Sequence, residues 1–151
     1  MNLLCSHILL GLCLLLGAGC DEQSPAGLPV VEMKIGKGDF VIEVARTPAE
    51  QETGLMKRDS MPKDHGMIFV FSGDEVRKFW MKDTRFPLDI LFLDAGGKVV
   101  SIHQMKAYDL QETSSDYPAR YAIELNDGTA TETGVKSGDV LEIPNQARSS
   151  K

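Results

Sequence analysis

The segment from Phe79 to Thr84 holds the densest group of side chains that could bind a ligand. If this segment is a strand, its side chains alternate between two faces, and Trp80, Lys82 and Thr84 share one of them. Trp80 is the only tryptophan of the chain, and beside these polar neighbours and Asp83 it could line a groove and stack on a ligand. The competing interpretation is that Trp80 fills the core with its indole N–H bonded to a carbonyl.

Asp89 is the second candidate, because it places a carboxylate inside the apolar run 88–93. A buried carboxylate must be paired or hydrogen-bonded. Asp89 is therefore either a ligand-binding or catalytic group with a perturbed pKa, or a structural acceptor for backbone N–H groups, Arg120 or Lys82. An enzyme could also use Asp83 or Asp89 as its acid or base. The residue pattern leaves these alternatives open.

Copper binding is a third alternative, because thioether and imidazole ligands suit Cu(I). Five methionines and two histidines could supply them: Met56, Met61, Met67, Met81, Met105, His65 and His103. Several of these methionines lie in apolar patterns where methionine fills gaps in a core. The sequence also has no nucleophile elbow, phosphate-binding glycine loop or dinucleotide fingerprint. We therefore predict neither a metal site nor a cofactor.

The N-terminal segment predicts export and lipid attachment. Residues 8–19 form an apolar run of twelve, shorter than the roughly 20 residues of a membrane-spanning helix and typical of a signal peptide. The run ends in Leu16-Gly17-Ala18-Gly19-Cys20, which resembles the lipobox of bacterial lipoproteins, although Gly17 stands where that family favours leucine. We expect residues 1–19 to be removed and Cys20 to carry the lipid, the alternative being an ordinary cleaved signal peptide.

The other cysteines, Cys5 and Cys13, lie within the expected signal peptide. No cysteine follows Cys20, so the exported domain has no disulfide, thiol nucleophile or thiolate metal ligand. Asp21 directly after Cys20 resembles the signal that keeps lipoproteins at the inner membrane of enteric bacteria. The expected location is the periplasmic face of a membrane, with the inner membrane favoured by Asp21.

Charge argues against nucleic acid as a partner. All 16 Lys and Arg and all 22 Asp and Glu follow Cys20, and the net charge is -6. Nucleic-acid binding depends on clustered Lys and Arg that neutralise phosphates. The expected partners are instead the membrane, through the lipid, and a small molecule or another envelope protein.

Residues after the anchor predict a linker over 20–29 and then mostly short strands separated by turns. Thr47, Pro48 and Glu50 predict the start of a helix, as N-cap, first helical residue and capping-box partner. That helix is expected over about 48–57. The expected strands cover 31–35, 40–45, 67–71, 77–82, 88–93, 99–105, 119–125 and 140–143. They predict one small, mainly β (α+β), barrel-like domain over 30–144, a long loop over 106–118 and a flexible tail over 145–151.

Several motifs carry a resemblance to a known family. They are Gly54-Leu55-Met56, Gly66-Met67-Ile68-Phe69-Val70-Phe71, Phe79-Trp80-Met81-Lys82-Asp83-Thr84, Pro87-Leu88-Asp89-Ile90-Leu91-Phe92-Leu93-Asp94, Ala119-Arg120-Tyr121-Ala122-Ile123-Glu124-Leu125 and Gly134-Val135-Lys136-Ser137-Gly138-Asp139. In order and spacing they resemble the DUF192 family over about residues 31–143. The resemblance implies a compact, mainly β domain that is often exported and whose activity is not established.

The chain departs from the family pattern at the turn Asn126-Asp127-Gly128, which is more often hydrophobic or contains alanine, and at two further positions. Asp83 stands where the family usually has asparagine, and Gln51 where it usually has arginine. If these positions belong to a ligand site, both departures make that site more negative in this chain.

These observations predict a lipid-anchored envelope protein whose small β domain is a ligand- or partner-binding accessory module. The expected site is a groove around Trp80, Lys82, Asp83, Thr84 and Asp89, with His103 or Arg120 beside it. Trp80 would stack on the ligand and the polar residues would orient it. The alternatives are an envelope enzyme that uses Asp83 or Asp89, and a copper-binding protein.

Overall fold

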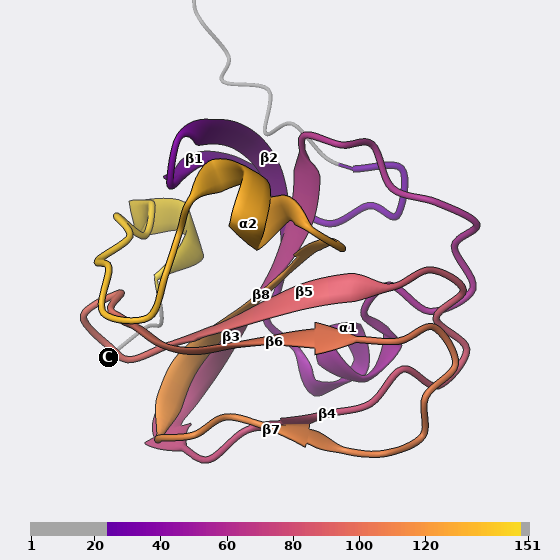
Figure 1. Ribbon diagram of the computed structural model, residues 1–151. Helices are drawn as coiled ribbons and strands as arrows, with labels where there is room; N and C mark the ends of the chain where they lie inside the picture. Colours follow the sequence, from indigo (N-terminus) through magenta and orange to yellow (C-terminus); the bar gives the residue numbers. More distant parts are fainter. Residues whose placement is uncertain (1–23, 149–151) are drawn as a thin grey trace, which may run out of the picture.

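A computed structural model describes residues 24–148 (Figure 1). The expected signal peptide, Cys20 and Asp21 lie outside the described residues. The elements in chain order are β1 (Val30–Ile35), β2 (Gly38–Ala45), α1 (Pro48–Thr53), β3 (His65–Glu75), β4 (Lys78–Phe79), β5 (Leu88–Leu93), β6 (Val99–Met105), β7 (Thr113–Ser114), β8 (Ala119–Asn126), α2 (Thr129–Thr133) and the 3-10 helix η1 (Asn145–Ala147).

Six of the strands form one sheet in the order β1-β2-β3-β8-β5-β6. The β2–β3 pair is parallel, and α1 lies in the connection between these two strands. The other neighbouring pairs are antiparallel. Strands β4 and β7 pair with each other in a separate two-stranded sheet. The prediction of a mainly β domain with about eight strands is confirmed. The sequence predicted a single helix, and the structure has α2 as a second one.

The sheet is open, which corrects the barrel-like expectation. Its edge strands are β1 and β6, and separate segments cover its two faces. Figure 1 shows α2 above the sheet and the β4–β7 pair below it. Because these segments bury the apolar side chains of both faces, the sheet does not need to close on itself to do so.

Helix α1 begins as the sequence predicts and ends earlier. The Thr47 hydroxyl accepts a hydrogen bond from the Glu50 N–H (3.2 Å), and the Glu50 carboxylate accepts one from the Thr47 N–H (2.9 Å), which completes a capping box. Gly54 ends the helix with a φ of 46°, where a residue with a Cβ is disfavoured. The chain then turns inward and buries Leu55.

Two apolar clusters lie on opposite faces of the sheet because successive side chains of a strand point to opposite sides. The first cluster includes Ile68, Leu91, Ile123 and side chains from α2 and the C-terminal segment. The second includes Phe69, Ile90 and Ala122 with Leu55 and Met81 from the connecting segments. Along β8, the alternation therefore directs Glu124 to the same face as Ala122.

Within residues 24–148, no helix is both long enough and apolar enough to cross a membrane.

Candidate functional site

A cleft of about 380 Å³ lies on the face of the second cluster. Strand β3 supplies Phe69 and Phe71, β8 supplies Glu124, and Thr84 lies on the loop before β5. The end of α1 with the following turn, and the segment around β4, supply the remaining lining residues, which are 51–56 and 76–80. The cleft thus lies where three segments far apart in sequence meet over the sheet.

Aromatic rings form much of its surface. The Phe79 ring meets those of Phe69 and Phe92 edge to face, with centroids 4.9 and 5.6 Å apart. Such contacts add to the energy of burial and fix ring orientation. Trp80 is 46% exposed and lines the cleft, so it does not fill the core. The Lys82 ammonium lies 5.2 Å from the centre of the Trp80 ring, within the range of a cation–π contact.

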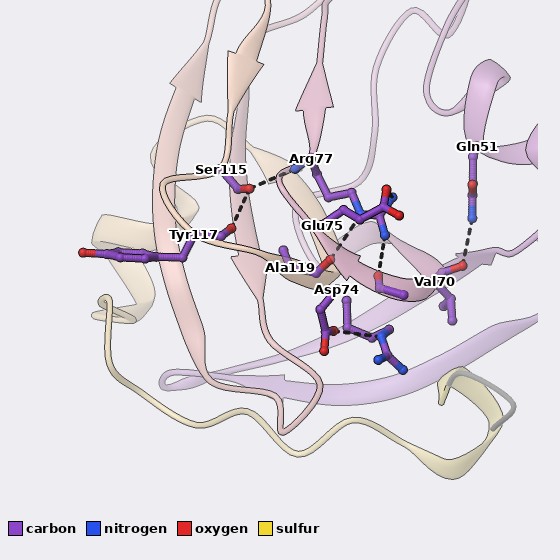
Figure 2. Close-up of polar contacts among 10 residues, drawn as sticks. Gln51, Val70, Asp74, Glu75, Arg77, Ser115, Tyr117 and Ala119 are labelled. Atoms are coloured by element: carbon purple, nitrogen blue, oxygen red, sulfur yellow. Dashed lines mark hydrogen bonds and ion pairs between the residues drawn. The ribbon is translucent and has the colours of Figure 1, made fainter.

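Arg77 fixes the β4 side of the cleft (Figure 2). Its guanidinium donates hydrogen bonds to the carbonyls of Gly73 and Ala119 and lies 4.0 Å from the centre of the Phe71 ring. Its backbone N–H donates to the Ser115 hydroxyl (3.0 Å). The Arg77 side chain thereby joins the cleft wall to β3 and β8, and its backbone joins the wall to the segment that follows β7.

Gln51 occupies the opposite side of the cleft. Its amide nitrogen donates to the carbonyls of Arg46 (3.0 Å) and Val70 (2.8 Å), the second of which is drawn in Figure 2. The bond to Val70 holds α1 against β3, and both bonds keep a neutral polar side chain on the lining.

Glu124 is the buried ionisable group of the cleft. It is 5% exposed and pairs directly with Met67 of β3 and Ile90 of β5, so apolar neighbours flank it in the sheet. No residue of the range 24–148 forms a hydrogen bond or ion pair with its carboxyl group. Burial raises the pKa of Glu124 to about 8, although the charge of Arg58 works in the opposite direction. The group is therefore mostly protonated at neutral pH.

Arg58 is engaged with a different carboxylate. Both of its terminal nitrogens donate to Glu43, which is 3% exposed. Burial alone would raise the pKa of Glu43, but hydrogen bonds from Arg58 and Ser24 lower it. Glu43 pairs with Met67 in the β2–β3 register, so Glu43 and Glu124 lie in one cross-strand row with a single arginine beside them.

Three non-glycine residues with a left-handed backbone meet next to Thr84. Lys57, Asp83 and Tyr108 have φ values of 64°, 54° and 60°. The Lys57 N–H donates to the Asp83 carbonyl (2.8 Å), and the Tyr108 N–H donates to the Thr84 carbonyl (3.0 Å). Such conformations are uncommon and gather at functional sites. Among non-glycine residues, aspartate and asparagine adopt the left-handed conformation most readily. Asp83 therefore suits its position through its backbone conformation.

Of the residues predicted from the sequence, Trp80 and Thr84 line the cleft, and Lys82 contacts Trp80. Asp89 lies on the opposite face, because it pairs with Leu125 of the first cluster while its neighbour Ile90 pairs with Glu124.

Asp89 is a structural hydrogen-bond acceptor in the structure. Its Oδ2 accepts from the Ala130 N–H (2.7 Å) at the start of α2, and its Oδ1 has no partner of good geometry. Burial raises the pKa of Asp89, and the N–H groups of Ala130 and Gly128 work in the opposite direction.

His103 and Arg120 do not line the cleft. His103 Nε2 lies 3.3 Å from a carboxylate oxygen of Asp116, and Arg120 Nε donates to Asp74 (2.9 Å). The structure therefore brings together the tryptophan segment of the predicted groove and separates it from Asp89, His103 and Arg120.

Sequence reasoning missed Glu124 as a site residue. The available signal was a carboxylate inside the apolar run 122–125, which is the same signal that identified Asp89. The turn 54–56 and Arg77 carried no chemical signal of their own, because their roles depend on the contacts that the fold creates.

No group of three or more His, Cys, Asp or Glu within the described range is placed to hold a metal ion. Four of the methionines considered as copper ligands, Met61, Met67, Met81 and Met105, are buried in the second cluster.

A family model for DUF192, described as "Uncharacterized ACR", matches residues 31–143. No curated protein matches the chain. The solved structures that are similar to it include two crystal structures. One is a protein of unknown function from Novosphingobium aromaticivorans DSM 12444, 34% identical, with a TM-score of 0.75 over 83% of this chain and 94% of that chain. The other is a proposed transcription regulator from Sinorhizobium meliloti 1021, 38% identical, with a TM-score of 0.69 over 75% of this chain and 91% of that chain.

Proposed function

Because the chain belongs to the DUF192 family, whose activity is not established, we propose a function from its own geometry. The domain is a small-molecule-binding module, and its binding site is the cleft over Glu124.

The observation that carries this proposal is the buried carboxyl group of Glu124, which has no hydrogen-bond or ion-pair partner among residues 24–148. Burying a polar group without a partner costs stability, and here the group lies on the lining of a cleft large enough for a small organic molecule. Apolar pockets with a few placed polar groups are the usual form of ligand sites. A ligand that reaches Glu124 supplies the partner that the protein lacks.

The module works at a membrane surface in this proposal. The apolar run before Cys20 and the small residues that precede this cysteine support export and lipid attachment. Strand β1 begins at Val30, ten residues after Cys20, and this length of chain spans at most about 35 Å. The lipid therefore holds the cleft close to the membrane on the periplasmic side.

The Sinorhizobium protein is described as a proposed transcription regulator, but we do not propose binding to nucleic acid for this chain. The net charge of -6 opposes binding to nucleic acid.

Trp80 offers a direct test, since it is the only tryptophan and lines the cleft. The purified protein is screened against small molecules by tryptophan emission and by thermal denaturation. A cleft ligand changes the emission and, at 100 times its dissociation constant, stabilises the fold by about 2.7 kcal/mol. The Trp80→Phe variant should lose the emission signal and still be stabilised by ligand. Ligands that stabilise the protein but perturb only residues remote from the cleft would contradict the proposal.

One observation favours a second function, an envelope enzyme with Glu124 as general acid. A carboxyl group that stays protonated near neutral pH is suited to donate a proton, and burial raises the pKa of Glu124 to about 8. Turnover of a cleft ligand that stops in Glu124→Gln, while ligand binding persists, would establish this function. Binding without turnover in the wild-type protein would leave the module as a binder.

A further inference from the structure

We propose that the ligand of the cleft is an organic ammonium, a compact apolar or aromatic body that carries one protonated amine, and that the amine pairs with the carboxylate of Glu124. This inference rests on the proposed binding function and adds the chemical class of the ligand.

The cations around the cleft are committed to other acceptors. Arg58 donates to both carboxylate oxygens of Glu43. The Lys78 ammonium contacts Glu112 at 2.8 Å. Among the described residues, Glu124 is thus a buried carboxyl group of the cleft without its own counter-ion.

Arg77, the remaining cation of the lining, is also engaged. It contacts Glu75 at 3.3 Å and donates to the carbonyls of Gly73 and Ala119. A ligand anion would find no uncommitted positive group there and would face Glu52 at the lining as well.

The remaining surface suits the body of such a ligand. Phe69, Phe71, Phe79 and Trp80 line the cleft. Aromatic rings bind apolar groups by burial and attract cations through the negative charge of their faces. Lys82 already lies 5.2 Å from the centre of the Trp80 ring, so the tryptophan at the cleft is in contact with an ammonium within the protein itself.

Proton linkage distinguishes this ligand class from neutral ones. Without ligand, burial holds Glu124 protonated, with a pKa of about 8. Ion pairing with an ammonium needs the carboxylate form, so binding moves one proton from Glu124 to the solvent. Below pH 8 the affinity for an amine that remains charged should fall about tenfold per pH unit. A neutral ligand that accepts a hydrogen bond from the carboxylic acid would show no such fall.

The test compares benzylamine with benzyl alcohol, which has nearly the same shape and no charge. Binding to the purified protein is measured between pH 6 and 8 by Trp80 emission and by isothermal titration calorimetry in buffers of different ionisation enthalpy. We expect benzylamine to bind more tightly than the alcohol at pH 8. Its affinity should fall about tenfold from pH 7 to pH 6, and its binding at these pH values should release one proton from Glu124.

Two matched variants locate the charge. Glu124→Gln keeps the size of the side chain and should weaken benzylamine at least tenfold at pH 8. Glu132→Gln removes an exposed carboxylate from α2, on the opposite face of the sheet, and should change the affinity less than about twofold. The pH profile of the wild-type protein supplies the same information if Glu124→Gln does not fold.

The outcomes separate the two proposals. Equal affinity for the amine and the alcohol, or amine binding that is independent of pH, overturns the ammonium inference and leaves the cleft as a binding site. The inference alone also fails if screened molecules bind the cleft and benzylamine does not. If neither probe nor any screened molecule binds the cleft, the proposed binding function fails as well.

Discussion

At the scale of single residues, two carboxyl groups of one cross-strand row have pKa values that are shifted in opposite directions. Glu43 and Glu124 flank Met67 in the register of β2, β3 and β8. Both are buried, but Arg58 donates two hydrogen bonds to Glu43 and none to Glu124. The partner, rather than the burial, lowers the pKa of one and leaves the other raised.

Glu124 should make the wild-type protein less stable as the pH rises. Its pKa is about 8 in the folded protein, above the ordinary glutamate value of 4.5 that holds in the unfolded chain, so the folded state binds more protons than the unfolded state between these pH values. The free energy of unfolding should fall with a slope of up to about 1.4 kcal/mol per pH unit over this range. Urea denaturation at several pH values should show this slope in the wild type and a smaller one in Glu124→Gln. Equal slopes would show that Glu124 does not titrate in this range.

Asp83 should matter for its backbone conformation. With φ at 54°, Asp83→Val places a β-branched residue in the left-handed region and should cost about 1–2 kcal/mol of stability. Asp83→Gly relieves this strain and should change stability by less than about 1 kcal/mol. Chemical denaturation measures both. A valine variant as stable as the glycine variant would contradict this role.

Residue patterns identified the tryptophan segment but not the partners of each carboxyl group. Glu124 and Asp89 both interrupt apolar strands. The sequence does not show that Asp89 has the Ala130 N–H of α2 as a partner, whereas Glu124 has no partner among the described residues. That difference depends on which segment covers each face of the sheet, which only the tertiary structure reveals.

At the scale of elements, the N-terminus of helix α2 is capped by a side chain from strand β5. Its N-cap is Gly128, which provides no side-chain hydrogen bond. Asp89 of β5 provides the missing acceptor by binding the Ala130 N–H, and it lies near the positive end of the helix backbone. The buried carboxylate that the sequence marks as unusual therefore joins β5 to α2.

Removing this cap should loosen α2 before the rest of the fold. Asp89→Ala should cost about 1–2 kcal/mol, the usual value for a lost N-cap acceptor, whereas Asp89→Asn keeps an acceptor and should cost less. Hydrogen exchange should speed up at the amide of Ala130 in the alanine variant. Unchanged exchange there, with ligand binding lost, would instead support a role of Asp89 in the ligand site.

Local sequence signals predicted the start of α1 better than its end. The capping box depends on Thr47, Pro48 and Glu50, which are close in sequence. The end depends on Gly54, whose φ of 46° turns Leu55 into the second cluster. The helical pattern through Lys57 does not encode this packing, so the expected helix was too long.

At the scale of the whole molecule, the alternation of apolar residues predicted strands but not how they join. Open sheets and barrels show the same period of two. The parallel β2–β3 pair and the position of β8 between β3 and β5 are contacts between distant segments. These contacts decide that Glu124 and the tryptophan segment meet at one cleft.

The membrane anchor is tested on the whole chain. In a bacterial host, the wild-type protein should incorporate labelled palmitate and fractionate with membranes, and Cys20→Ser should lose the label. Cys13→Ser is the matched control and should keep it, since it lies within the expected signal peptide. Labelling that persists in Cys20→Ser would contradict lipid attachment at this cysteine.

The most direct test of the binding site is the titration of Glu124 itself. Carbon-13 NMR of the side-chain carboxyl group, assigned with Glu124→Gln, gives its pKa in the ligand-free protein. The unpaired, buried state predicts a midpoint near 8 and a marked fall when benzylamine is added. A midpoint near 4.5 that benzylamine does not change would show that Glu124 already has a partner or is solvated, and would contradict the account of the cleft.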